Sequence, residues 1–307
     1  MTSRSTATSC GWTATCSYPH GDDLAQLDKE LEATHRAGLI DVTRVDRAPI
    51  TTFDTGPALR FPRQGQFHVL KYLQGVAAAA TRIHNHTRAR DFQGGENARV
   101  ETDNGTVSAG TIVVATNTPV NDRVAIHTKQ AAYRTYVVGA RVRHGSVPPI
   151  LLWDTPDPYH YVRLQSRPPA AGGDGDDVLI VGGEDHKTGQ ADDAAERFAR
   201  LEAWTRERFP QVQAFEYRWS GQVMEPVDSL AFIGRNPSDY SNVYIATGDS
   251  GNGMTHGTIA GILISDLISG RSNPWTALYD PSRKTVGAAK EFVKENLNVV
   301  AQNIPTS

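Results

Sequence analysis

The stretch from residue 242 to residue 270, NVYIATGDSGNGMTHGTIAGILISDLISG, constrains the fold of this chain more than any other. A β-prone run at 243–245 is followed by Gly248, Gly251 and Gly253, and apolar residues then recur at helical spacing up to Gly270. This pattern predicts a strand, a glycine turn and a helix that begins near Met254. Glycines before a helix let backbone N–H groups approach an anion, and the helix dipole adds positive potential there. We therefore expect an anion-binding crevice at this turn, with an ordinary tightly packed strand–helix turn as the plain alternative.

A second strand ending resembles the end of a parallel strand at a crevice. The run TIVVATN, residues 111–117, is apolar and closes on a small residue and a polar turn. Asn117 suits such a turn because asparagine tolerates a left-handed backbone. We expect the strands at 112–115 and 243–246 to lie in one domain and to end at the same crevice.

The rest of the chain is predicted to mix helices and strands. Helices are expected over Asp22–Gly38, Val69–Ala80 and Asp192–Phe209, the last with Phe198, Leu201, Ala203 and Trp204 buried. Residues 83–115 read as a small antiparallel unit with a hairpin at Asp103-Asn104-Gly105, and residues 124–234 read mainly as sheet. One more helix is predicted near the end of the chain, at 286–300.

Composition narrows the class of protein. The net charge of −3 over 307 residues does not indicate binding to nucleic acid. The apolar run at 259–268 is too short to span a bilayer. Two cysteines are too few for a disulfide scaffold or a zinc site, and His84 and His86 have no third ligand nearby, so no metal is expected. A hydrolase using Asp185-His186 or Asp249-Ser250 is disfavoured, because Asn252 stands where a nucleophile elbow needs glycine. These features favour a cytoplasmic enzyme.

The glycine spacing at 251, 253 and 257 is not a nicotinamide fingerprint, because the helix leads into SNPWTALYDPSR, which is not strand-like. Four other segments, FPRQGQFH (61–68), VVATNTPVND (113–122), RWSGQVMEP (218–226) and ATGDSGNGMTHGTIAG (246–261), carry a resemblance instead. Over about residues 20–307 the chain resembles the amino-acid-oxidase-like FAD-dependent oxidoreductases. The subgroup that looks nearest carries a C-terminal Rieske iron–sulfur domain.

This resemblance implies a mixed α/β (α+β) fold, in which an incomplete FAD-binding Rossmann-like domain is interleaved with an antiparallel-sheet substrate domain. The expected division is an irregular segment at 1–22, a partial FAD-binding domain at 65–122 and 230–285, a substrate domain at 23–64 and 123–229, and a helix and tail at 286–307. The cofactor implied is FAD. The residues expected to hold it are Ala115, Thr116 and Asn117 at one strand end, and Gly248, Asp249, Ser250, Gly251, Asn252, Gly253 and Met254 at the glycine turn.

The resemblance also implies hydride transfer to flavin from a carbon bearing an amine or amino-acid-like nitrogen. Arg163 and Arg134 are the candidates to hold a substrate carboxylate, and Tyr161 and His256 complete the predicted catalytic set. Two further tyrosines, Tyr136 and Tyr159, are expected to line the pocket. The expected partners are a small-molecule amine and an electron acceptor or iron–sulfur domain, with no nucleic acid and no membrane.

Members of this family begin with a strand, a GxGxxG turn and an acidic residue for the ribose, and the sequence contains no such unit. We therefore expect an incomplete product of an FAD-enzyme gene, truncated at both ends, and the alternative is a non-catalytic remnant that binds no FAD. The segment Ser9–Ser17 can be back-translated into codons whose shifted frame encodes a family-like segment. The nucleotide sequence decides that hypothesis.

Overall fold

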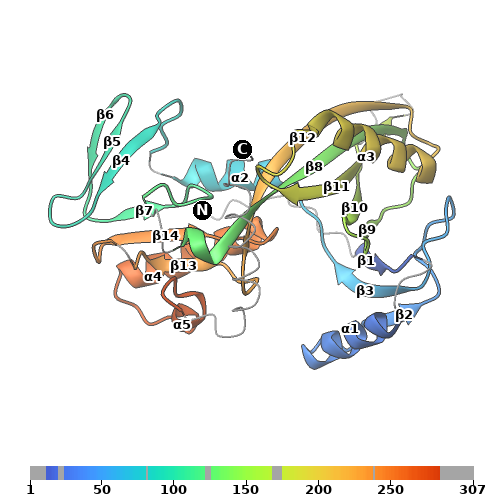
Figure 1. The fold of residues 1–307 in the computed structure, drawn as a ribbon, viewed down its shortest axis with the longest axis horizontal. Helices are drawn as coiled ribbons and strands as arrows, with labels where there is room; N and C mark the ends of the chain where they lie inside the picture. The colour runs from blue at the N-terminus through green and yellow to red at the C-terminus, as the bar shows by residue number, and fades with distance from the viewer. Residues whose placement is uncertain are drawn as a thin grey trace, which may run out of the picture. The chain divides into compact units, whose positions relative to one another are not determined.

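A computed structural model describes residues 12–19, 24–80, 82–121, 126–167, 175–237 and 239–283. The chain divides into two units, the first made of residues 1–83 and 134–221 and the second of residues 84–133 and 222–307. Two long strands, β8 (Gln130–Arg143) and β12 (Ala214–Pro226), contain two of the three points where the chain passes between the units, and the third lies between residues 83 and 84. Figure 1 labels the elements of both.

The first unit is built on an eight-stranded sheet with the order β12-β8-β11-β10-β9-β1-β3-β2. Its remaining strands are β1 (Trp12–Ser17), β2 (Thr43–Val45), β3 (Ala58–Gln64), β9 (Leu151–Asp154), β10 (His160–Gln165) and β11 (Asp176–Lys187). Its helices are α1 (Leu24–Arg36), α2 (Val69–Ala79) and α3 (Ala194–Arg208). These helices agree with the predicted ones to within a few residues.

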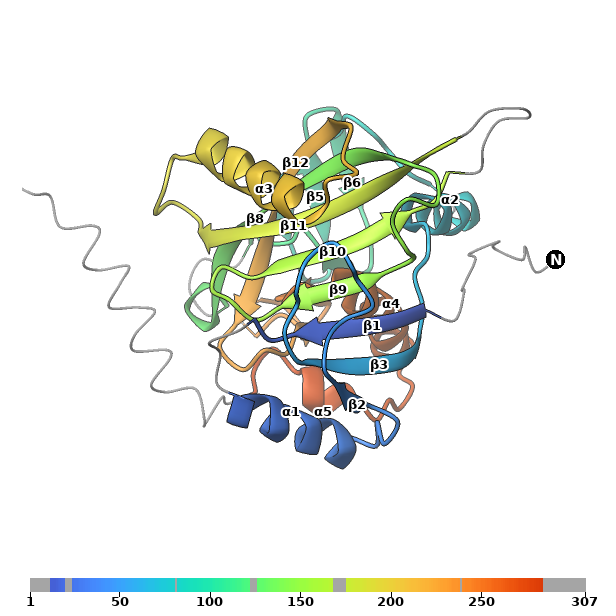
Figure 2. The ribbon, with the colours of Figure 1, turned by 90° about the vertical axis from the view of Figure 1, so that its right-hand side faces the viewer.

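Helix α3 covers one face of this sheet (Figure 2). Val162 and Leu164 of β10 pack with Leu179 of β11 and Leu201 of α3 in one buried cluster. Successive side chains in a strand point to opposite faces, so the residues between them point to the other face of the sheet. Ala203 of α3 is exposed, so the prediction that it is buried is wrong.

The N-terminal segment corrects one expectation. Residues 1–22 were expected to be irregular, but Trp12–Ser17 forms β1, antiparallel to β3 and parallel to β9. Ala14 and Cys16 are buried in this position. The partners of β1 lie some 40 and 140 residues further along the chain. The composition of this Ser- and Thr-rich segment alone therefore could not predict that it forms a strand.

The second unit holds two three-stranded sheets. One has the order β13-β14-β7, made of β13 (Phe232–Arg235), β14 (Val243–Thr247) and β7 (Ile112–Val114). The other is the antiparallel β4 (Ala89–Gln93), β5 (Arg99–Thr102) and β6 (Gly105–Ser108). The helices of this unit are α4 (Gly253–Ile268), α5 (Thr276–Tyr279) and the short 3-10 helix η1 (His127–Lys129).

The central predictions for this unit are confirmed. Strand β7 pairs in parallel with β14, and α4 follows the glycine turn. The hairpin at 103–105 is present, since Thr102 pairs with Gly105. Together the units form the mixed α/β fold that was expected. The helix predicted at 286–300 lies outside the described residues.

Candidate active site

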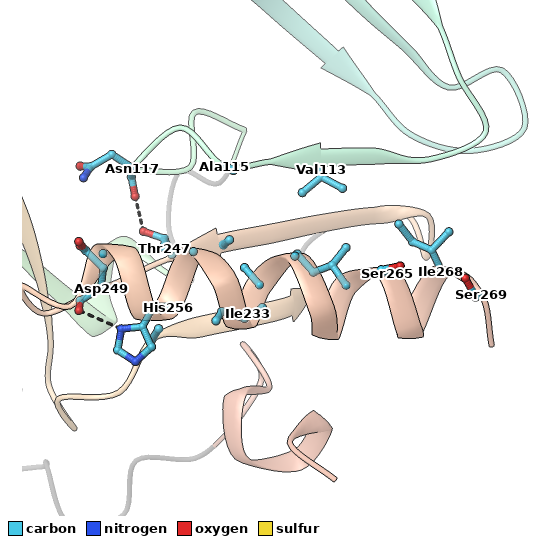
Figure 3. A pocket seen from close by; sticks show the side chains of 17 residues that line it. Val113, Ala115, Asn117, Ile233, Thr247, Asp249, His256, Ser265, Ile268 and Ser269 are labelled. Carbon is cyan, nitrogen blue, oxygen red and sulfur yellow. Dashed lines mark hydrogen bonds between the residues drawn. The ribbon is translucent and has the colours of Figure 1, made fainter. Parts of the chain in front are cut away.

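A crevice of about 610 Å³ runs along α4 in the second unit. One wall comes from the end of β7 and the residues after it, and the floor comes from β13, β14 and α4. Figure 3 shows Asn117 and Asp249 at one end of α4, and Ser265, Ile268 and Ser269 at the other. Asn117, Thr247, Asp249 and His256 make the crevice polar where the helix begins, two serines lie at its other end, and the lining between them is mostly apolar.

At the polar end of the crevice, hydrogen bonds connect the ends of β7 and β14. The Thr247 hydroxyl at the end of β14 donates to the carbonyl of Asn117, which follows β7. The Gln130 amide in turn donates to the Thr247 hydroxyl oxygen over 3.2 Å. Asn117 has φ 64°, which confirms the left-handed conformation expected for it.

The glycine turn is held against the end of β12. Gly248 has φ 73°, and a Cβ added to it would lie 2.7 Å from Cγ of Pro226. Ser250 has φ 45°; its N–H donates to the Met224 carbonyl over 3.0 Å, and its hydroxyl donates to the Glu225 carboxylate. A left-handed backbone at a non-glycine residue costs free energy that these contacts offset.

The first turn of α4 has free donors. Asn252 is the N-cap residue, but its side chain makes no capping hydrogen bond and instead donates to the Ser250 carbonyl over 2.9 Å. Within the part of the chain that the structure describes, the Asn252 side chain thus leaves the first N–H groups of the helix uncapped. A Cβ on Gly257 or Gly261 would meet open space, so the crevice side of the helix is flat. A planar group with an anionic or hydrogen-bond-accepting edge fits this arrangement.

His256 lines the same crevice from the first turn of α4. Its Nδ1 lies 3.0 Å from the Asp249 carbonyl oxygen, and its ring meets that of Tyr279 edge-on at 5.9 Å. Of the ten predicted cofactor residues, Ala115, Asn117, Asp249 and Gly253 line the crevice directly. The remaining ones are Thr116, Gly248, Ser250, Gly251, Asn252 and Met254, which belong to the two turns that frame it.

Arg163 and Tyr161 lie in the first unit, on the face of β10 that points away from the α3 cluster. Burial lowers the pKa of Arg163, and the neighbouring Tyr161 opposes this shift. Among the described residues, no carboxylate forms an ion pair with Arg163. Burial also raises the pKa of Tyr161, so this phenol is neutral at physiological pH.

Arg134 and Tyr136 do not join Arg163. Tyr136 is 2% exposed, packs edge-on against Phe198 of α3 and bonds through its hydroxyl to His186 Nε2 at 3.0 Å. Arg134 is two residues away on the same strand and shares that face, where it donates to the Ser220 hydroxyl over 3.0 Å. Arg134 and Arg163 therefore point to opposite faces of the sheet and stay separate candidates for a substrate carboxylate, and Tyr136 lies in the α3 cluster rather than on the face of Tyr161 and Arg163.

Several residues of the site were not found from the sequence. Gln130 and Thr247 bind the strand ends together; Thr247 lies in the segment 246–261 but was not among the predicted site residues, and Gln130 stands in none of the four segments. No three His, Cys, Asp or Glu side chains come together as a metal-binding group within the described ranges.

Comparisons with known proteins agree on one family. The family model described as FAD dependent oxidoreductase (DAO) matches residues 2–267. A protein named Rieske 2Fe-2S iron–sulfur protein YhfW, from Bacillus subtilis (strain 168), is 26% identical over 232 residues, which is 74% of this chain and 44% of that protein. The chain thus spans less than half the length of this relative.

Solved structures share the fold. The L-proline dehydrogenase from P. horikoshii matches with a TM-score of 0.69 and 17% identity, over 91% of this chain and 78% of that one. The glycine oxidase from Geobacillus kaustophilus gives the same TM-score and identity, over 91% and 76%. The L-amino acid deaminase from Proteus vulgaris gives 0.65 and 17%, over 90% and 74%. At these identities the likeness establishes the fold alone. Within the described ranges, every helix is too short or too polar to serve as a membrane span.

Proposed function

This chain belongs to the DAO family of FAD-dependent oxidoreductases, and from that membership we propose that it takes part in oxidising a carbon–nitrogen bond of a small amine or amino-acid-like substrate. We assign the partial FAD-binding domain to residues 65–122 and 230–285, of which 65–83 belong to the first unit. The substrate domain is then 23–64 and 123–229, of which 123–133 and 222–229 belong to the second unit. Bound FAD supplies the acceptor for the hydride that leaves the carbon next to the nitrogen. The protein contributes binding, orientation and charge.

The crevice along α4 is the observation that carries this proposal. The uncapped first turn of α4 offers N–H donors, and the open side of Gly257 and Gly261 leaves room for a planar group. We assign FAD contacts to residues 115–117 and 248–254, which frame the polar end of this crevice. His256 is oriented by its contact with the Asp249 carbonyl oxygen, and we place it beside the same cofactor.

Arg163 is the residue we propose to hold a substrate carboxylate. Its guanidinium is half-buried and has no carboxylate partner among the described residues, so it can form a charge-assisted pair with a ligand. Tyr161 beside it supplies a neutral hydroxyl. The names of the structural relatives, which include proline, glycine and L-amino acids, support a substrate of this class.

The electron acceptor is proposed from the curated relative. YhfW is named as a Rieske iron–sulfur protein, and a 2Fe-2S centre takes electrons one at a time. We propose that electrons leaving the flavin of this system pass to such a centre or to an equivalent acceptor. Flavin that is reduced by substrate and then reoxidised by an added 2Fe-2S protein would support this step.

A titration of the purified chain with FAD tests the proposal. We expect weak, saturable binding, measured by equilibrium dialysis, because the crevice supplies one glycine turn and one strand end as contacts. Gly253→Val should weaken this binding about tenfold, because its side chain would enter the crevice and displace the Asp249 carboxylate, whose Oδ2 lies 2.7 Å from the position of a Cβ.

Gly65→Val is the matched control, since a Cβ there meets open space outside the crevice, and FAD binding should be unchanged. Equal weakening by both variants would contradict the assigned role of the glycine turn. If the wild-type chain shows no saturable FAD binding, and adding the glycine-rich segment described in the Discussion restores none, the chain is a non-catalytic remnant.

A further inference from the structure

A second cavity, of about 450 Å³, lies on the first unit, and none of its described lining residues also lines the crevice along α4. Its floor comes from Val178 and Ile180, which are two positions apart on β11 and so point to the same face of the sheet. Gln165 of β10 pairs with Val178 and extends this floor. The cavity is therefore a hollow in the sheet of the first unit.

Two exposed aromatic side chains of β12 form one wall of the second cavity. Tyr217 and Trp219 are 46% and 45% exposed. The Tyr217 ring lies over Gly139 of β8, the strand between β12 and β11, since a Cβ on that glycine would lie 3.0 Å from Tyr217 Cδ2. The missing side chain at Gly139 thus lets the aromatic wall meet the floor. Exposed aromatic faces of this kind can stack on a planar ring of a ligand.

Basic side chains at the start of α2 border the same cavity. The Lys71 N–H donates to Nδ1 of His68 over 3.4 Å, so a neutral His68 ring carries its proton on Nε2, where it is a donor. The Lys71 ammonium has no ion-pair partner within the described part of the chain. No Asp or Glu is among the described residues that line the cavity. Its rim therefore favours an anion.

Arg167 is oriented by the aromatic wall. Its Nη2 donates to the Tyr217 hydroxyl over 2.8 Å, and its guanidinium carbon lies 5.7 Å from the centre of that ring. Its Nη1 lies 3.7 Å from Oε2 of Glu216, which does not line the cavity. The positive charge at the rim thus rests mainly on Lys71, while Arg167 supplies N–H donors in a fixed direction.

We propose that the second cavity binds an aromatic anion, which is a planar ring that carries a carboxylate or a phosphate. The ring stacks on Tyr217 and Trp219, and the anionic group accepts hydrogen bonds from Arg167, Lys71 and His68. A simple anion lacks the stacking surface, and a neutral ring leaves Lys71 without a counter-charge. This site is independent of the proposed function, because none of these residues is assigned to FAD or to the substrate.

Saturation-transfer NMR on the full chain, without added FAD, tests the inference. The probes are AMP and indole-3-carboxylate, which distinguish a nucleotide from an aromatic carboxylate. Adenosine and indole-3-carboxamide are their neutral counterparts, and inorganic phosphate and acetate are added as competitors. At least one aromatic anion should bind about tenfold more tightly than its neutral counterpart. Phosphate or acetate should displace it only weakly, and high salt should reduce the difference.

Variants separate the aromatic wall from the basic rim. Trp219→Leu should abolish the saturation transfer to the ring protons, and Trp219→Phe should retain it. In Lys71→Gln the preference for the anion should fall to about twofold. The matched controls are Trp275→Leu, at an exposed tryptophan of the second unit, and Arg36→Gln, at an exposed ion pair with Glu32. Neither control should change the binding.

Three results would overturn the inference: neutral counterparts that bind as tightly as the anions, binding that survives Trp219→Leu, or no binding of either aromatic anion. FAD is itself an aromatic anion, so the two sites must be told apart. Probe binding that is weakened by Gly253→Val and not by Trp219→Leu would place the ligand in the crevice and would also contradict the inference. The proposed function fails separately, in the FAD titration, which Trp219→Leu should leave unchanged.

Discussion

Positive φ angles mark the residues that shape the crevice. Asn117, Gly248, Ser250 and Gly251 all adopt left-handed backbone conformations, and all belong to the two turns at the polar end of the crevice. Two of the four carry side chains, and each is anchored by hydrogen bonds. Local strain held by surrounding contacts is typical of a ligand site, which agrees with the proposed role of these turns.

Gly248→Ala is expected to lower the free energy of unfolding by about 3 kcal/mol. The substitution combines a left-handed backbone with a collision, since the new Cβ would lie 2.7 Å from Pro226 Cγ. Gly251→Ala is the matched control, because its φ of 70° imposes the same backbone strain in open space and should cost about 1 kcal/mol. Urea unfolding measures the free energy of unfolding of both variants. If Gly248→Ala and Gly251→Ala lose the same amount, the contact with Pro226 does not add to the cost of the backbone strain.

Cys16 provides a pH-dependent prediction. Burial, helped by the charges of Glu30 and Asp154, raises the pKa of the Cys16 thiol from 9.0 to about 12. The folded state then holds this proton more tightly than the unfolded state, so the stabilising contribution is complete below pH 9 and is lost as pH rises towards 12.

In a Cys10→Ser background, Cys16 should react with a thiol reagent only as fast as the first unit unfolds. The free energy of unfolding should also fall more steeply above pH 9 than in the corresponding Cys16→Ala protein. Rapid labelling of the native chain at pH 8 would contradict the burial of this thiol.

Single elements bring together parts of the chain that are remote in sequence. Strand β1 lies between β3 and β9, so it joins the first and later segments of the first unit in one sheet. Its residue Thr15 is 2% exposed and pairs with Arg60 on one side and Leu152 on the other. The ladder with β3 shifts register around Thr13, and the ladder with β9 begins only at Ala14.

Thr15→Pro should therefore destabilise the first unit by about 2–4 kcal/mol, because proline removes a buried N–H from a central strand. Thr13→Pro, placed at the register shift, should cost much less. Circular dichroism during urea unfolding would measure the difference. If the two variants unfold at the same urea concentration, β1 does not contribute a central strand in solution.

At the scale of the whole molecule, β7 is an edge strand of the sheet β13-β14-β7 among the described residues of the second unit. Val113 in the middle of β7 is 44% exposed, although both its neighbours are buried. Parallel strands are normally covered on both faces, and the apolar part of the crevice lies directly beside this residue. The described residues also contain one glycine turn at a helix start, whereas an FAD pyrophosphate normally rests on a second one.

We therefore expect the 307-residue chain to bind FAD weakly by itself, and a glycine-rich strand–helix–strand segment from a DAO relative to strengthen that binding when it is supplied as a fusion. The added segment would supply several charge-assisted hydrogen bonds to FAD. Each contributes about 1.5–3 kcal/mol, so together they raise the affinity for FAD by orders of magnitude. Flavin absorbance of the purified protein is the measurement. A fusion whose GxGxxG glycines are replaced by valine is the control and should stay colourless. Stoichiometric, tight FAD in the unmodified chain would show that its own residues suffice.

Local patterns in the sequence determined the elements around the glycine turn. The strand at 243–247, the turn and the helix at 253–268 follow from glycine placement and apolar periodicity, which act over a few residues. The segment resemblances identified the family for the same reason, because the motifs that carry them are short and continuous.

Tertiary structure decided what depends on partners distant in the chain. Strand β1 exists through pairing with β3 and β9, and Thr247 meets Asn117 across 130 residues. Arg134 and Arg163 look equivalent in sequence, yet their strands turn them to opposite faces of the sheet. The direction of a side chain depends on strand register and local backbone conformation, and these are set by packing and pairing with the rest of the sheet.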